Sequence, residues 1–315
     1  MSQLNFMNIA QGKKKLRCEK FLDEMKLVIP WKKLCRVVEP HYTSKDTGRK
    51  LKDLETMLKI HCLQQWYNLS DPGCEEAIYD RNSFQKFLEI DLLGERVPDE
   101  TTILNFRHLL EKHKLAKKIF KTINKHLEQQ GLLMKEGTIV DATLIASAKS
   151  TKNKDKKRDP EMSSTKKGNN WHFGMKANIG VDSQSGLVHS VEPTTAKVHD
   201  RTSLEDLLHG EEKAILGDKG YFKDDDKRKC RKDGIFWGVM DKAKRNHKLS
   251  GSQKKRNRKL RSIRAKVEHP FQVIKCQWHY CKARYRGIEK NAGQLYMLFG
   301  LHNLFKARKA LMSVA

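Results

Sequence analysis

The first 135 residues alternate apolar and polar positions with the period of an α-helix. In residues 54–63, apolar side chains recur every three or four positions, and the pattern stops at the turn-forming sequence Ser-Asp-Pro-Gly. A second stretch, residues 98–131, begins with a proline and two acidic residues and ends at a glycine, as expected of one long helix. The pattern therefore predicts an N-terminal helical domain over residues 1–135.

After residue 136, short runs rich in β-branched and aromatic residues replace the helical period. Residues 137–146 hold Thr, Ile and Val around Asp141, which is typical of a buried strand. The same criteria predict a hairpin and two further strands, at residues 171–182, 187–196, 213–218 and 235–240. Helices predicted between and after these strands favour an α/β domain over residues 136–315, a mixed five-stranded sheet flanked by helices.

Residues 147–170 between the first two strands are polar and charged, without periodicity, and predict a mobile loop. Trp171 follows this loop directly. It could stack on an unpaired base, but we favour a core aromatic that starts a strand. Further along, His199 and Asp200 precede a short helix, and we expect Asp200 to cap that helix.

The charge of the chain changes the picture from a fold to a class of partner. Lys and Arg number 64 against 38 Asp and Glu, which gives a formal net charge of +26. A solvated surface explains a small excess, but one of this size favours binding to a polyanion such as nucleic acid. We expect basic segments at residues 13–20, 149–167 and 242–266 to contact backbone phosphates.

The sequence shows neither a long apolar run nor the apolar core of a signal peptide near its start. We therefore expect a cytoplasmic, nucleoid-associated protein with no membrane partner. The seven cysteines include no Cys-x-x-Cys pair, which argues against a structural zinc site and favours ordinary thiols in a reducing compartment.

Three isolated acidic residues suggest phosphodiester chemistry. Asp141 lies in an apolar strand, Asp218 ends another, and Glu268 is the only acidic residue between Asp241 and Glu289. Two divalent metals can activate an oxygen nucleophile and stabilise the leaving oxygen, and such metals prefer carboxylate ligands. The three acids could therefore converge on one metal site within a basic surface.

Each acid also has a purely structural explanation. Asp141 could pair with a buried arginine or accept from a backbone amide, and Asp218 could cap the turn that follows it. Glu268 could form a helix-surface ion pair with Arg264, four residues earlier. For any one of these residues alone, the structural explanation is the stronger one.

The joint order of several motifs resembles the DDE transposases of bacterial insertion sequences, in the group named "insertion sequence five". The resemblance extends over nearly the whole chain, from about residue 40 to 312, and each short motif by itself is weak. The segments that carry it are residues 58–88, 98–111, 137–145, 171–200, 216–221, 261–275 and 284–304.

The resemblance implies that Asp141, Asp218 and Glu268 form the catalytic triad of an RNase H-like domain. It implies two divalent ions per active site, Mg²⁺ or Mn²⁺, as well as binding to terminal inverted repeats and target DNA. It also implies hydrolysis that exposes 3′-OH ends, strand transfer to target DNA, and a homodimer or higher assembly on DNA.

The family has a Tyr, Arg, Glu and Lys signature around its last carboxylate. Arg264, Glu268 and Lys275 match it, but Arg261 stands at the tyrosine position. On one helix these four residues would form a stripe that holds phosphates beside the metals. Pro270 would kink that helix after Glu268 or begin a new helix. We also expect DNA contacts from the preceding basic residues Lys254, Lys255, Arg256, Arg258 and Lys259.

Two other functions fit the composition. One is a basic, noncatalytic nucleic-acid-binding protein, which would not need three acids in these contexts. The other is an RNase H-like nuclease that cuts DNA without joining it. A transposase is the function that we expect.

Overall fold

The computed structural model describes residues 15–43, 51–152, 154, 156–243 and 247–314. The expected helical region is confirmed over the part of residues 1–135 that is described. Its helices are α2 (Arg17–Val28), α3 (Trp31–Val38), α4 (Leu54–Tyr67), α5 (Asp71–Asp80), α6 (Asn82–Leu88), α7 (Glu100–Lys112) and α8 (Leu115–Gln129).

The single helix expected over residues 98–131 is wrong, because the structure divides it into α7 and α8. Asp99 starts α7 by accepting a hydrogen bond from the backbone N–H of Thr102. Lys114 then adopts a left-handed backbone with φ of 51°, which ends the regular helix and turns the chain into α8. No glycine or proline marks this turn in the sequence.

The C-terminal half contains a mixed sheet whose strand order is β2-β3-β1-β5-β6, with β4 paired to β3. β1 is antiparallel to β3 and parallel to β5, and β5 is parallel to β6. The strands are β1 (Gly137–Ala146), β2 (Ser163–Lys167), β3 (Asn170–Asp182), β4 (Val188–Thr195), β5 (Ala214–Gly217) and β6 (Phe236–Val239).

The mixed sheet with flanking helices is therefore confirmed, but in the described residues it has six strands rather than five. The additional strand is β2, which forms within the segment expected to be a loop. Its sequence, Ser-Ser-Thr-Lys-Lys, is polar, and backbone pairing with β3 rather than burial makes it a strand. The expectation of a buried Trp171 is also wrong, because this residue is 64% exposed.

The 3₁₀ helix η1 (Glu39–His41) follows α3, and the remaining elements follow β4. They are the 3₁₀ turn η2 (Asp200–Ser203), α9 (Leu204–Leu207), η3 (Lys219–Tyr221), α10 (Asp224–Lys232), α11 (Gly251–Arg264), η4 (Ala265–Val267), α12 (Glu268–Gln272), the π-helical segment η5 (Val273–Gln277) and α13 (Ile288–Val314).

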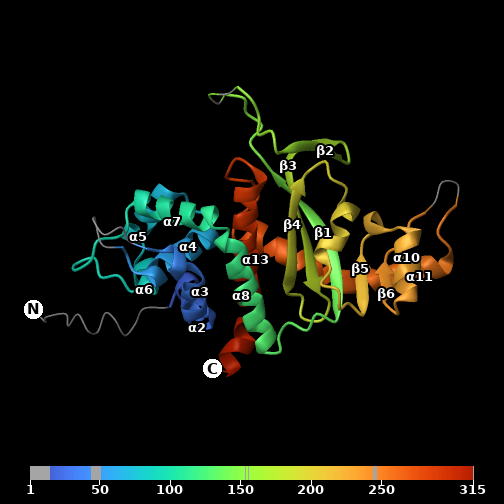
Figure 1. The fold of residues 1–315 in the computed structure, drawn as a ribbon, viewed down its shortest axis with the longest axis horizontal. Coiled ribbons are helices and arrows are strands. Elements are labelled where there is room, and N and C mark those ends of the chain that lie inside the picture. Colours follow the sequence, from blue (N-terminus) through green and yellow to red (C-terminus); the bar gives the residue numbers. More distant parts are fainter. Residues whose placement is uncertain (1–14, 44–50, 153, 155, 244–246, 315) are drawn as a thin grey trace, which may run out of the picture.

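Helix α13 joins the two halves of the molecule. It packs against α8, α2 and α4 on one side and against β4 on the other, and Figure 1 shows α8 and α13 between the N-terminal helices and the sheet. Buried side chains of α2, α4, α8, β1, β3, β4 and α13 form one continuous apolar cluster. The sheet is thus held on a helical base that includes residues before 136. Among the described helices, none is both long and apolar enough to cross a bilayer.

Candidate active site

Asp141 lies in the middle of β1 with only 18% of its side chain exposed. One carboxylate oxygen accepts a hydrogen bond of 2.9 Å from the backbone N–H of Ala142. The other accepts from the guanidinium of Arg264 at 3.1 Å. Both structural explanations considered for this acid, an arginine partner and a backbone amide, are therefore realised.

Asp218 lies beside Asp141 because β1 and β5 are parallel neighbours. Ile139 pairs with Leu216, and each aspartate follows its paired residue by two positions. Adjacent strands lie about 5 Å apart, so the two carboxylates start from the same level of the sheet. Asp218 also caps the next turn, since its side chain accepts from the N–H of Gly220 at 2.5 Å.

Glu268 reaches the same place from the helical side. Its carboxylate lies 3.9 Å from Arg264, the ion pair expected from their spacing of four residues, and 68% of its side chain is exposed. Arg264 therefore lies between Asp141 and Glu268. Its Nε–H is buried without a hydrogen-bond partner among the described residues, so one donor of this arginine is unsatisfied.

The pKa values support one electrostatic site. Burial raises the pKa of Asp141, Arg264 opposes this rise, and the negative charge of Asp218 adds to it. Burial lowers the pKa of the Arg264 guanidinium, but Asp141, Asp218 and Glu268 outweigh burial and raise it overall. One cation thus interacts with all three acids that the sequence singled out.

The helix that carries Glu268 is irregular, and the expectation of a new helix that starts at Pro270 is wrong. The hydrogen-bonding pattern changes at η4, before Glu268, and α12 begins at Glu268 itself rather than at Pro270. Pro270 falls in the first turn of α12, where its missing N–H costs little. The backbone of Glu268 stays right-handed, so the chain does not break cleanly there.

Lys275 belongs to the π-helical segment η5 and points at β1. Its ammonium donates to the hydroxyl of Thr143 at 2.6 Å and to the carbonyl of Leu144 at 2.8 Å. Burial lowers the pKa of this lysine. Lys275 and Arg264 therefore both reach the strand of Asp141, despite the irregular helix between them.

Helix α11 presents a basic face. Its N-terminus is set by Ser250, whose side chain accepts from Gln253 N–H, and the helix starts at Gly251. Asn257 and Leu260 are buried on its inner face. The exposed basic side chains of this helix are Lys254, Lys255, Arg258, Lys259 and Arg261.

Arg256 is not one of these exposed residues. It forms an ion pair of 2.9 Å with Asp241 and donates to the carbonyls of Val239 and Trp237 at the end of β6. The structure thus gives Arg256 a role inside the fold instead of a free position for DNA. Parts of the expected phosphate-contacting segments, residues 13–14, 153, 155 and 244–246, lie outside the described residues.

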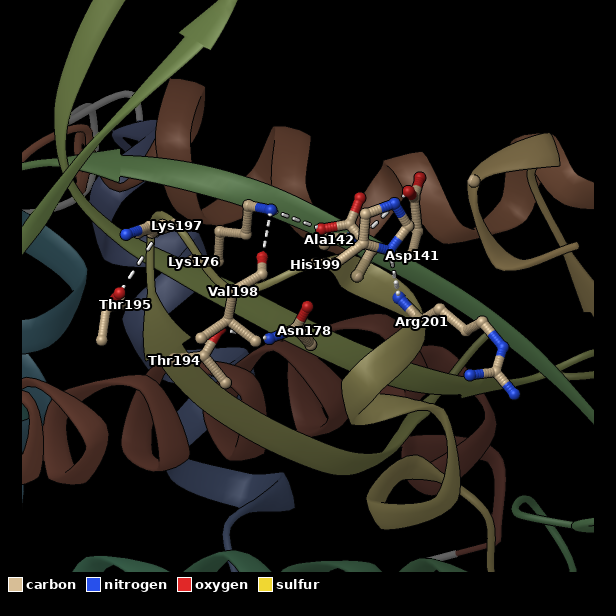
Figure 2. Close-up of polar contacts among 12 residues, drawn as sticks. Asp141, Ala142, Lys176, Asn178, Thr194, Thr195, Lys197, Val198, His199 and Arg201 are labelled. Carbon is tan, nitrogen blue, oxygen red and sulfur yellow. Dashed lines mark hydrogen bonds and ion pairs between the residues drawn. The ribbon is translucent and has the colours of Figure 1, made fainter.

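The expectation that Asp200 caps the short helix after His199 is wrong. His199, not Asp200, caps η2 by accepting from the N–H of Arg201. Asp200 instead forms an ion pair with Lys176 of β3 at 2.8 Å, and Lys176 also donates to the carbonyl of Val198. Figure 2 shows this network beside Asp141 and Ala142 of β1.

Tyr221 is a residue near the site that sequence reasoning missed. It is fully buried, and its hydroxyl has no hydrogen-bond partner among the described residues. Burial raises its pKa, and the charges of Asp200, Asp141 and Asp218 raise it further. The sequence feature that could have identified Tyr221 is its position three residues after Asp218, at the end of the motif over residues 216–221.

The ligand chemistry of the three carboxylates suits a hard divalent cation. In the described part of the chain, however, no three His, Cys, Asp or Glu residues are already grouped as metal ligands. Arg264 instead neutralises Asp141 and Glu268 from between them. The residues fit such an ion in type, and binding it requires their side chains to rearrange around Arg264.

Comparison with known proteins gives the family. The transposase DDE domain matches residues 133–304, which is more than half of the chain, and a second transposase domain of the DUF772 type matches residues 11–109. The chain belongs to the DDE transposase family. Its sheet order and family membership identify the C-terminal half as an RNase H-like domain of a DDE transposase enzyme, and this family implies dependence on divalent metal.

A solved structure, the cryo-EM structure of the piggyBac transposase synaptic complex with hairpin DNA, is similar to this chain at 10% identity. The similarity has a TM-score of 0.45 and covers 97% of this chain and 77% of the other.

Proposed function

We propose that this transposase mobilises a bacterial insertion sequence of the "insertion sequence five" group. It binds the terminal inverted repeats, hydrolyses phosphodiesters at the element ends to expose 3′-OH groups, and joins these ends to target DNA. Support comes from the order of motifs along the chain and from the family match.

The observation that carries the proposal is that Arg264 contacts both Asp141 and Glu268, while the charge of the neighbouring Asp218 also raises its pKa. Asp141 and Asp218 start from one level of two parallel strands, and Glu268 approaches from α12. These acids come from three separate elements and share a single cation. An arrangement that serves stability alone does not require Glu268, whose side chain is mostly exposed, to lie beside Arg264.

We infer that Asp141, Asp218 and Glu268 hold two Mg²⁺ or Mn²⁺ ions. Such ions would supply charge stabilisation to the attacking and leaving oxygens of the phosphodiester. Arg264 exchanges its carboxylate partners for a DNA phosphate when the site is loaded, since its charge persists at all relevant pH values. Lys275 fixes the helix of Glu268 against β1 by its two hydrogen bonds.

The DNA path follows from the exposed charges. The outer face of α11 contacts backbone phosphates leading to the triad, and the N-terminal domain, residues 1–135, recognises the element ends. The catalytic domain comprises residues 136–315. Because two ends must be processed together, the transposase acts as a homodimer or higher assembly, on DNA in the cytoplasm and at the nucleoid.

The test is a reaction with labelled terminal-repeat DNA, a target plasmid and Mg²⁺. Joined product that depends on the terminal-repeat sequence supports the proposal, and a duplex with scrambled repeats is the matched control. Cleavage without joining would instead identify a nuclease. Tight binding without either reaction would identify a noncatalytic binding protein.

A further inference from the structure

We propose that the β2–β3 ribbon is a DNA-deforming arm, in which Trp171 stacks on a base that has left the helical stack. The inference rests on the proposed binding of DNA to this chain and adds a contact outside the triad and outside the basic face of α11. Three observations support it: the exposure of one tryptophan, the positive charge around that residue, and the rigidity of the ribbon that carries it.

Trp171 is exposed to an extent unusual for this protein. Its exposed fraction is 64%, whereas Trp66, Trp237 and Trp278 are 2%, 7% and 4% exposed. A large aromatic ring left in water loses the free energy that burial would give it. An exposed ring on a DNA-binding enzyme gains that free energy when it stacks on a base, because every base has a π-face.

The ribbon that carries Trp171 is basic. Lys166 lies directly opposite Trp171 in the β2–β3 ladder, and Lys167 pairs with Asn170 at the tip. The two strands are joined by a two-residue turn, in which Gly168 has φ of 61°, a conformation that glycine adopts without strain. A two-stranded ribbon of this width fits the major groove of B-DNA, where the lysines would meet phosphates.

The base of the ribbon is held firmly. Phe173, two residues after Trp171 and on the same face, is buried, and the guanidinium of Arg158 lies 5.4 Å from its ring centre. On the opposite strand, the hydroxyl of Ser163 contacts that of Thr195 of β4 at 2.7 Å. The ring of Trp171 is therefore presented by a fixed element, which lowers the entropy lost on stacking.

The ribbon continues the sheet that carries the active site. Asp141 pairs with Ile179 of β3, and because side chains alternate, Trp171 lies on the same sheet face as Asp141. Eight residues separate Ile179 from Trp171, which corresponds to roughly 26 Å of strand at about 3.3 Å per residue. Along one DNA strand this is about eight nucleotides.

The inference predicts a preference for DNA that is already distorted. A bulged or mismatched base costs less to unstack than a paired one, so the wild-type protein should bind such DNA more tightly than a perfect duplex. The preference should be largest when the defect lies about eight nucleotides from the cleaved position. Stacking should also quench the fluorescence of Trp171, the most exposed of the described tryptophans.

The experiment compares Kd values for terminal-repeat duplexes with and without a single-base bulge, moved stepwise along the DNA. We expect Trp171→Ala to weaken binding to the best bulged duplex roughly 10-fold and to remove the preference, while Trp171→Phe keeps most of it. Phe236→Ala, which removes another exposed aromatic ring (56% exposed), is the matched control and should leave the preference unchanged.

An Ala variant that keeps the bulge preference and the quenching would overturn the inference. So would a preference lost equally in the Phe236→Ala control. These readouts are binding and fluorescence, so they stand apart from the joining reaction. If wild-type protein shows the preference without joining DNA, the proposed function fails and this inference survives.

Discussion

The guanidinium of Arg264 lies 3.1 Å from the carboxylate of Asp141, although 123 residues separate them in the chain. The same arginine lies 3.9 Å from Glu268. It therefore acts as the shared counter-ion of one acid on a strand and one acid on a helix. This relationship connects the stability of the folded enzyme to the chemistry of its site.

Replacing Arg264 with alanine should destabilise the fold. Asp141 would remain mostly buried without its ion-pair partner, and breaking a partly buried pair of this kind costs about 2 kcal/mol. Urea unfolding followed by circular dichroism measures the difference. Arg261→Ala is the matched control, because Arg261 is exposed on the same helix and should change the free energy of unfolding by less than about 0.5 kcal/mol. Equal effects of the two variants would contradict the role of Arg264.

The raised pKa of Asp141 predicts how the free energy of unfolding depends on pH when a chelator keeps the protein free of metal. Folding favours the protonated form, so this stabilisation is complete below the ordinary pKa of 3.8 and is lost as the pH rises through the raised folded-state pKa. Asp141→Asn does not titrate. The free energy of unfolding of the wild type, minus that of the variant, should therefore fall with rising pH above about 4 and then level off. A difference that grows with pH would show that the pKa is lowered instead.

The outer face of α11 should dominate the salt dependence of DNA binding. Each phosphate contact contributes a slope of about 0.9 in a plot of log Kd against log salt concentration. Replacing Lys254, Lys255, Arg258, Lys259 and Arg261 with alanine should lower that slope by up to about 4.5.

Arg256→Ala provides the matched control for this experiment. Its guanidinium is committed to Asp241 and to carbonyls of β6, so the variant should lose stability rather than salt dependence. A larger loss of slope for Arg256→Ala than for Lys254→Ala would place the DNA on another face.

Most strands of the catalytic domain were predictable because buried strands need runs of apolar and β-branched residues, which are visible in the sequence. The apolar run around Asp141 predicted β1 with its observed ends, and the strand predicted to end at Asp218 is β5, which ends one residue earlier at Gly217. Strand β2 was not predictable, since its polar residues are held by pairing with β3. Nothing local in the sequence distinguishes Trp171, at the exposed tip of β3, from an aromatic residue in its buried part.

The side-chain partners were only partly predictable. The spacing of four residues correctly suggested the pairing of Arg264 with Glu268, but no local pattern reveals which arginine meets Asp141 across 123 residues. Arg256 illustrates the same limit, because its partner Asp241 lies 15 residues away on the far side of a basic segment. Lys275 reaches β1 through a π-helical segment whose register differs from that of a regular helix.

The central claim is that Asp141, Asp218 and Glu268 form one metal-dependent active site. The most direct measurement is the rate of cleavage of terminal-repeat DNA by Asp141→Asn, Asp218→Asn and Glu268→Gln in Mg²⁺, with the Kd for the same DNA measured alongside. Since even outer partners of metal ligands contribute roughly 10- to 100-fold, each variant should cleave at least about 100-fold more slowly while its Kd changes little. A variant that cleaves at the wild-type rate would remove its residue from the site and contradict the claim.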